Sequence, residues 1–515
     1  MKKQSIAKAT AVLGIAGIFA KFLGIFFRWP LIMLIGDEGI GYYQMSYPLY
    51  MFFIAMASGI PVAISKMVSE RNATNNKEEA ILVLRQAIFL MLVMGVAFTL
   101  FIYCFSRQIT ITLKWDQKAY YSLLAIALAP LFICIVGSFR GFFQGQQNMN
   151  PTAISQIIEQ LGRVVVGVTL AYILLPKGIE YAAGGAAFGA VAGAFFSSIY
   201  LIITFYSKKF SLAINIKEKW MIGKLLYIAI PISIGAAVSS VMGLIDSIIV
   251  PQKLLIAGFS QREATMLYGQ LTGKAFVLVN VPLTLSIALC ASIVPIISEA
   301  FILDKLEEVH KKTQMAIGVS MVIALPSCFG LYFMSYQVLN LIFPGHGDGY
   351  NILKYLSIAI PFIILAQTCT AILQGIGRYS IPVKNLFFGC FVKIVITLIL
   401  VSVPNINIYG AVIGTIFGYG TAAVLNLLRV KKILKLKLNI HEVIIKPAYA
   451  SVIMIISVVI LFANVYNITK SNGISCLISI SAGMVIYIAL TFIFGIFDYT
   501  RVKSRIKKKN IYKEH

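Results

Sequence analysis

The sequence predicts an all-α polytopic membrane protein with fourteen transmembrane helices, in two pseudo-symmetric six-helix lobes plus two C-terminal helices. Three observations predict it. Of the 515 residues, 59% are hydrophobic and only 12% are charged, a balance that excludes a water-soluble globule. Apolar runs of about 20 residues, the length that crosses a bilayer as a helix, recur along the chain. Basic residues gather in alternate connecting segments, as expected for a protein threaded through a membrane.

The apolar runs give the helices in order and leave no room for a soluble catalytic domain. We expect them near residues 10–35, 44–67, 80–105, 119–140, 151–175, 182–206, 223–250, 270–297, 313–336, 350–373, 382–403, 408–428, 444–464 and 475–497. An even number of crossings puts both termini on one side. If that side is the cytoplasm, the inner segments hold 31 Lys and Arg residues and the outer loops hold eight, which favours a cell-membrane protein with both termini cytoplasmic.

The formal charge of +25 is therefore explained by topology, and no nucleic-acid partner is predicted. The seven cysteines are scattered singly and are typical of small buried apolar residues. The outer loop at 345–349 contains a His and an Asp among three glycines and is interpreted as a flexible turn. We predict no metal site, no cofactor and no enzymatic activity.

An internal duplication is visible at a shift of about 229 residues. Gln144-Gly145, Pro151 and Arg163 are echoed by Gln374-Gly375, Pro382 and Lys393, and Gly185-Ala186-x-x-Gly189-x-x-x-Gly193 is echoed by Gly410-Ala411-x-x-Gly414-x-x-x-Gly418. We expect an N-terminal lobe at 1–207, a cytoplasmic linker at 208–219 and a second lobe at 220–430. Two additional helices and a basic tail follow at 431–515. In folds with such parallel repeats, transport sites lie between the lobes.

Five bases and two acids fall within the predicted spans, where an ionisable group must be paired, face a watery cavity or reach the interface. In the first helix, Lys21 and Arg28 share one face with glycines, and no acid lies on that helix, because Asp37 and Glu38 follow its outer end. This face predicts the wall of a cationic cavity that attracts an anionic headgroup. The alternatives are that Arg28 reaches the outer interface and that Lys21 pairs with an acid from another helix.

Polar residues on the fifth and seventh helices are further candidates. On the fifth, Glu159 and Arg163 stand four residues apart, a spacing that favours a same-helix ion pair. The pair either orients the cavity or is only structural. On the seventh, Asp246 could couple transport to a cation, orient a base such as Arg28 or Lys274, or lock two helices together.

The eighth helix carries Lys274 near its start and Asn280 further along. Lys274 is a candidate for binding an anionic substrate, with an interfacial position as the alternative. Asn280 is a candidate for contacting sugar hydroxyls, with ordinary hydrogen bonding between helices as the alternative. Lys393 corresponds to Arg163 in the second lobe and receives no function.

Several stretches resemble the stage V sporulation protein B family, which belongs with MurJ-like flippases in the multidrug/oligosaccharidyl-lipid/polysaccharide exporter superfamily. The resemblance spans nearly the whole chain. The stretches are Lys21-Phe22-Leu23-Gly24, Ile35-Gly36-Asp37-Glu38-Gly39-Ile40-Gly41-x-Tyr43-Gln44, Tyr47-Pro48-Leu49-Tyr50, Gly59-Ile60-Pro61-Val62-Ala63-Ile64-Ser65-Lys66, Leu244-Ile245-Asp246-Ser247, Tyr268-Gly269-x-Leu271-Thr272-Gly273 and Val294-Pro295-x-Ile297-Ser298-Glu299-Ala300.

The resemblance implies fourteen helices around a central cavity and translocation of an undecaprenyl-pyrophosphate-linked peptidoglycan precursor, lipid II, for the spore cortex. Lys21 matches the family's base before Leu-Gly, but Phe27-Arg28 stands where an Arg-Asp pair is expected. Lys274 is near, not at, the basic position expected on the eighth helix.

We therefore predict a flippase that moves a lipid-linked saccharide by alternating access, with membrane lipid around it. The alternatives are a flippase for another lipid-linked polysaccharide precursor and a drug/cation antiporter of the same superfamily. The antiporter would need a net acidic cavity for cationic cargo, whereas bases outnumber acids in these spans. A membrane glycosyltransferase would need catalytic acids or a large outer loop.

Overall fold

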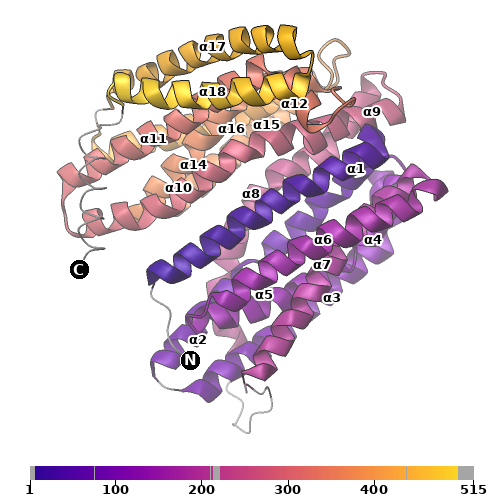
Figure 1. Ribbon diagram of the computed structural model, residues 1–515. Coiled ribbons are helices and arrows are strands. Elements are labelled where there is room, and N and C mark those ends of the chain that lie inside the picture. Colours follow the sequence, from indigo (N-terminus) through magenta and orange to yellow (C-terminus); the bar gives the residue numbers. More distant parts are fainter. Residues whose placement is uncertain are drawn as a thin grey trace. The chain divides into compact units, whose positions relative to one another are not determined.

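The computed structural model describes residues 6–74, 76–208, 210, 212, 221–436 and 438–496. The side chains of residues 6–16, 18, 21, 22, 25, 238, 239 and 291 lie outside that description. The regular secondary structure of the described part is all helical, and this part holds no strand (Figure 1). The helices are α1 (Ile6–Ala57), α2 (Gly59–Ala73), α3 (Lys77–Thr112), α4 (Ala119–Ile126), α5 (Ala129–Gly145), α6 (Asn150–Leu174), the 3₁₀ turn η1 (Leu175–Lys177), α7 (Ile179–Ser207), α8 (Ile222–Ile256), α9 (Gln261–Gly269), the π-helical turn η2 (Gln270–Ala275), α10 (Phe276–Ile302), α11 (Leu306–Phe333), α12 (Ser335–Ile342), α13 (Tyr350–Leu356), α14 (Ala359–Gly375), α15 (Ser380–Leu400), α16 (Tyr409–Leu434), the π-helical turn η3 (His441–Ile445), α17 (Lys446–Thr469) and α18 (Asn472–Ile493).

The predicted class of an all-α, multi-pass membrane protein is confirmed. Within the described residues, 11 helical stretches are long and apolar enough to cross a bilayer, or up to 13 if each of two bent pairs is one span. One of the 11 is Phe26–Ala73, which at 48 residues is more than twice the length that a single crossing needs. The number fourteen and the cytoplasmic position of both termini stay predictions.

Two segments that the sequence placed in outer loops are helical. The first is 36–43, because α1 consists of two helical stretches that meet at a kink at Gly36, whose non-helical backbone (φ 59°, ψ −166°) redirects the chain. The second is α9, which begins with a capping box. Ser260 accepts a hydrogen bond from the Glu263 amide, and the Glu263 carboxylate accepts one from the Ser260 amide.

Internal packing divides the chain into two compact units. The first unit comprises Met1–Val277 with Ile394–Ala411, and the second comprises Leu278–Lys393 with Val412–His515. The lobes predicted at 1–207 and 220–430, and the linker and tail around them, stay predictions. The hydrophobic core of the first unit includes Ile64, Val83, Phe142 and Phe205. In the second unit, Met334 packs with residues of α17 and α18.

Glycines set the spacing of α6 and α7 in the first unit. A Cβ atom on Gly189 would lie 2.6 Å from the carbonyl oxygen of Arg163 and 2.8 Å from the Cα atom of Gly167. Small residues at such points let helix backbones approach closely in a membrane. This contact holds the part of α6 that carries Glu159 and Arg163 firmly against its neighbour.

Candidate functional site

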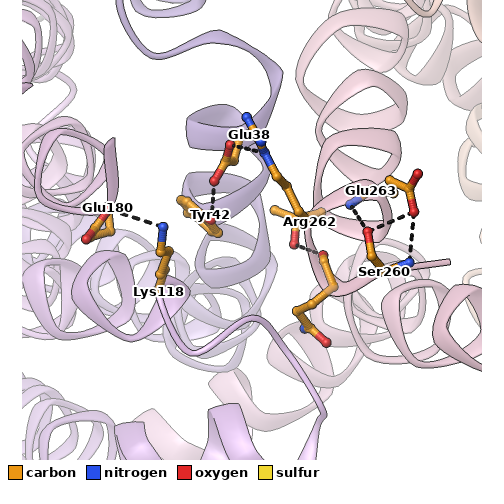
Figure 2. Close-up of polar contacts among 9 residues, drawn as sticks. Glu38, Tyr42, Lys118, Glu180, Ser260, Arg262 and Glu263 are labelled. Carbon is orange, nitrogen blue, oxygen red and sulfur yellow. Dashed lines mark hydrogen bonds and ion pairs between the residues drawn. The ribbon is translucent and has the colours of Figure 1, made fainter. Parts of the chain in front are cut away.

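The turn at Gly36 brings two consecutive acidic residues against α9 and η2. Glu38 accepts hydrogen bonds from the Tyr42 hydroxyl at 2.7 Å and from Arg262 Nε at 2.8 Å. Figure 2 shows Arg262 reaching from α9 to this carboxylate on α1. The Arg262 side chain is 72% exposed while that of Glu38 is 11% exposed, so this ion pair lies at the edge of the packed region.

Asp37 forms a second, more deeply buried pair. Its carboxylate accepts a hydrogen bond from Gln270 Nε2 at 2.8 Å and forms an ion pair with Lys274 of η2. The Lys274 side chain is 1% exposed. The alternative that Lys274 reaches the interface is therefore wrong: a carboxylate inside the protein neutralises the ammonium group, so it has no need to reach water.

Glycines make this junction possible. A Cβ atom on Gly41 would lie 2.6 Å from Cγ2 of Thr265, and one on Gly269 would lie 2.9 Å from the backbone nitrogen of Gly41. A larger residue at either position would push the helices apart and so break the ion pairs that Asp37 and Glu38 form. Two of the sequence stretches that carry the family resemblance, 35–44 and 268–273, are thus in direct contact.

Arg28 lies on the first half of α1 and faces residues of its second half. Its Nη2 donates to Gln44 Oε1 at 2.8 Å, and its guanidinium carbon stands 4.9 Å from the centre of the Tyr43 ring, a cation–π contact. Nη1 is buried without a hydrogen-bond partner. Among the described side chains no carboxylate forms an ion pair with Arg28. Whether Arg28 lines a cavity or reaches the outer interface stays a prediction.

Lys21 shares the predicted face, but its side chain lies outside the described residues. Its pairing therefore stays a prediction.

A row of tyrosines continues from Arg28 along α1. The rings of Tyr43 and Tyr47 are stacked, with centroids 5.6 Å apart and planes at 24°, and Tyr50 follows at 5.7 Å from Tyr47. At the far side of Tyr47, Nη1 of Arg163 on α6 stands 3.4 Å from the Tyr47 hydroxyl. Arginines thus flank the stacked pair, Arg28 over Tyr43 and Arg163 at Tyr47. We call these four residues the Arg–Tyr ladder.

The Glu159 carboxylate lies close to two guanidinium groups. Arg140 Nη2 lies 3.0 Å from Oε2, and Arg163 Nη2 lies 3.6 Å from Oε1. The predicted same-helix pair is confirmed, but it is only part of the cluster. The helix expected at 119–140 would end at Arg140, whereas α5 continues to Gly145. The Arg140 side chain is 17% exposed and also donates from Nε to Ser155 Oγ at 2.8 Å.

Asp246 and Asn280 lie in different units. Asp246, on α8, is 3% exposed. Its neighbour Ser247 accepts a hydrogen bond from Trp115 Nε1 at 2.6 Å through its carbonyl. Asn280 is exposed, and its backbone carbonyl accepts a hydrogen bond from the Thr284 hydroxyl. The roles of Asp246 in coupling and of Asn280 in binding sugar stay predictions.

The family model for polysaccharide biosynthesis proteins matches residues 6–301, which contain the ladder, Glu159 and Lys274. The chain belongs to the polysaccharide biosynthesis protein family.

Two relatives in this family are similar over most of their length. Stage V sporulation protein B of Bacillus subtilis (strain 168) is 30% identical over 452 residues, 86% of this chain and 86% of the relative. Lipid II flippase MurJ of the same organism is 27% identical over 457 residues, 83% of each chain.

Solved structures show the same fold at lower identity. A structure of lipid II flippase MurJ in an inward closed conformation has a TM-score of 0.73, at 16% identity over 94% of this chain and 98% of that one. An inward-facing multidrug resistance transporter of the MATE family has a TM-score of 0.71, at 16% identity over 81% and 94%. Because one fold serves both kinds of carrier, the cargo must be argued from side chains.

Proposed function

We propose that this protein is a flippase that carries undecaprenyl-pyrophosphate-linked peptidoglycan precursor, lipid II, across the cytoplasmic membrane by alternating access, for synthesis of the spore cortex. The relatives named for stage V sporulation and for lipid II flipping support this reading. The prenyl tail stays in lipid while the pyrophosphate and sugars pass through the protein. No step requires a bond to be made or broken, so the protein acts as a carrier rather than an enzyme.

One observation carries the proposal: Arg28 is a half-buried cation without a carboxylate partner among the described residues. Asp37 and Glu38 each have a basic partner, and Glu159 has two. A guanidinium group that keeps free donors in a low-dielectric site strongly attracts phosphate oxygens, which it can bind with two parallel hydrogen bonds.

The rival reading is a drug/cation antiporter, whose fold the MATE-family structure shares. Such a carrier needs carboxylates that are free to bind cationic cargo. In the first unit, Asp37, Glu38 and Glu159 are engaged by bases. Asp246 is also buried there and stays the candidate for coupling to a cation. The charge at Arg28 would repel a cation, so the geometry favours anionic cargo.

A complementation experiment tests this function. Bacillus subtilis strains lacking either the MurJ relative or the sporulation relative would express the chain, and accumulation of lipid-linked precursor would be measured in each. We expect the chain to relieve accumulation in the strain lacking the sporulation relative, and Arg28→Ala to abolish the relief. If the chain relieves accumulation only in the MurJ-deficient strain, its role belongs to vegetative growth instead.

Arg262→Ala is the matched control, because it removes an exposed guanidinium group from the same region of the unit. We expect it to retain relief. Membrane abundance and the thermal midpoint of the purified protein separate loss of function from loss of fold. Full relief of accumulation by Arg28→Ala at normal abundance would refute the role of Arg28.

A further inference from the structure

The cluster around Glu159 has an unbalanced charge. One carboxylate faces two guanidinium groups, and the side chains of Glu159 and Arg163 are each 11% exposed. A buried charge is costly unless an opposite charge and hydrogen bonds compensate it. Among the described residues, the three side chains together leave one positive charge without a counter-ion.

The two arginines are not equally engaged. Arg140 makes a hydrogen bond of 3.0 Å to Glu159 and another to Ser155. Arg163 stands 3.6 Å from the other carboxylate oxygen, which is beyond hydrogen-bond range. Its contact with the Tyr47 hydroxyl is long at 3.4 Å, and its Nε is buried without a partner. Arg140 is thus held in place, whereas Arg163 keeps most of its five donors free.

Further polar atoms near this base lack partners. Gln156 lies on the same face of α6 as Glu159 and Arg163 by helical spacing, and its Oε1 is buried without a hydrogen bond. The Tyr50 hydroxyl, next in the row of rings, is also buried without one. An unpaired acceptor beside unpaired donors suits a ligand that carries both hydroxyl groups and anionic oxygens.

We propose that Arg163, together with the Tyr47 and Tyr50 hydroxyls and Gln156, forms a second binding station for a phosphate-bearing saccharide, linked to Arg28 by the Arg–Tyr ladder. Glu159 is a positioning residue. It holds Arg140 in place and keeps Arg163 at 3.6 Å, so that an incoming phosphate can replace the Glu159 carboxylate as the partner of Arg163. The stacked rings keep the two guanidinium groups at opposite ends of one rigid surface. This inference rests on the proposed function and identifies where the cargo's anionic group moves after Arg28.

Binding of inorganic pyrophosphate to the purified full chain in detergent tests the station without requiring transport. The parent protein in these measurements carries Arg28→Ala, so that pyrophosphate bound at Arg28 does not mask the second station. We expect Arg163→Gln to weaken binding at least about tenfold, because a charge-assisted pair of hydrogen bonds is lost. Arg163→Lys keeps the positive charge but not the planar guanidinium group that can donate two parallel hydrogen bonds. We expect this variant to keep the thermal midpoint of the parent protein and still lose most of the affinity for pyrophosphate. Binding within about twofold of the parent protein in Arg163→Gln, a factor well under 1 kcal/mol, would overturn the proposal.

Glu159→Gln provides a readout that a merely structural role would not move. Removing the competing carboxylate should tighten pyrophosphate binding, and pyrophosphate should raise the thermal midpoint of this variant more than that of the parent. Weaker binding or a smaller rise would overturn the positioning role. Tyr47→Phe, which keeps the ring and removes the hydroxyl, should weaken binding less than Arg163→Gln.

Lys393→Met is the matched control, because Lys393 is the buried base at the corresponding place of the second half. We expect its pyrophosphate affinity to equal that of the parent. The outcomes also separate the two proposals. If Arg163→Gln binds normally while Arg28→Ala stops precursor transport, the flippase stands and the second station fails. If pyrophosphate binding depends on Arg163 while no precursor is moved, the station stands and the flippase fails.

Discussion

The helices α5–α7 and α14–α16, which the predicted duplication pairs with one another, are joined by polar networks of different character. In the first unit, Arg140 of α5 binds Ser155 and Glu159 of α6 and lies 3.4 Å from Ser197 of α7. In the second unit, Asn426 of α16 donates to Thr370 of α14 at 3.2 Å and accepts from Asn385 of α15 at 2.8 Å. One network is ionic, and the other consists of neutral amides and a hydroxyl.

The packing beneath these networks is nevertheless shared. Gly193 of α7 lies against α6, where an added Cβ atom would stand 3.1 Å from the backbone nitrogen of Arg163. Gly418 of α16 lies against α15, where its Cβ would stand 2.9 Å from the Lys393 Cβ. One turn before each base, the first half has Glu159 and the second has Gly389. The helix pair therefore needs the glycine but not the charge, which favours a functional origin for the arginines.

The largest effect expected from this contrast is that of Glu159→Gln. It leaves two buried guanidinium groups without a carboxylate and should cost about 3–5 kcal/mol of stability. Asn426→Leu removes only neutral hydrogen bonds in the second half and should cost about 1–3 kcal/mol. Denaturation of both variants in detergent measures the difference. Equal losses of stability in the two variants would show that the ionic network contributes no more than the neutral one.

A second prediction concerns what the halves share. Gly193→Ala and Gly418→Ala each force a Cβ atom into the neighbouring helix and should each lower stability by about 1–3 kcal/mol. The measurement is the thermal midpoint of each variant, with Gly243→Ala as the control, since no heavy atom lies within 4 Å of a Cβ there. A loss confined to one half would show that the packing is not common to both.

The smallest effect is expected at the rim of the ionic network. Ser197→Ala removes a long hydrogen bond of 3.4 Å from Arg140, which keeps its bonds to Ser155 and Glu159. We expect a loss of about 0.5–1 kcal/mol and no change in pyrophosphate binding. A loss as large as that of Glu159→Gln would mean that Ser197, rather than the carboxylate, holds Arg140.

The sequence predicted the helices well because apolar length alone defines them. It also predicted the pair of Glu159 and Arg163, since the spacing of four is local. The partner of Lys274 was missed because Asp37 follows the apparent end of a helix, and only the turn at Gly36 brings it inward. The role of Arg140 was missed for a similar reason, because it stands at the end of an apolar run and looks like a loop residue.

One signal for the ladder was present in the sequence. Tyr43, Tyr47 and Tyr50 are spaced four and three residues apart, so they lie on one face of a helix. The contacts of this face with Arg28 and Arg163 depend on how the two halves of α1 and the helix α6 pack. Such long-range contacts leave no pattern in a single sequence.

The π-helical turn η2 changes how this region should be aligned with its relatives. Its wider winding accommodates one residue more than an α-helical turn does, and one residue corresponds to about 100° of rotation around a helix axis. Lys274 lies in this turn and so points to Asp37 from an angle that a regular helix would not give it. Two relatives can therefore present the same ammonium group to the same carboxylate from positions that do not match in an alignment. Deleting a single residue from 270–273 would turn the ammonium group away while leaving every charged residue in the chain.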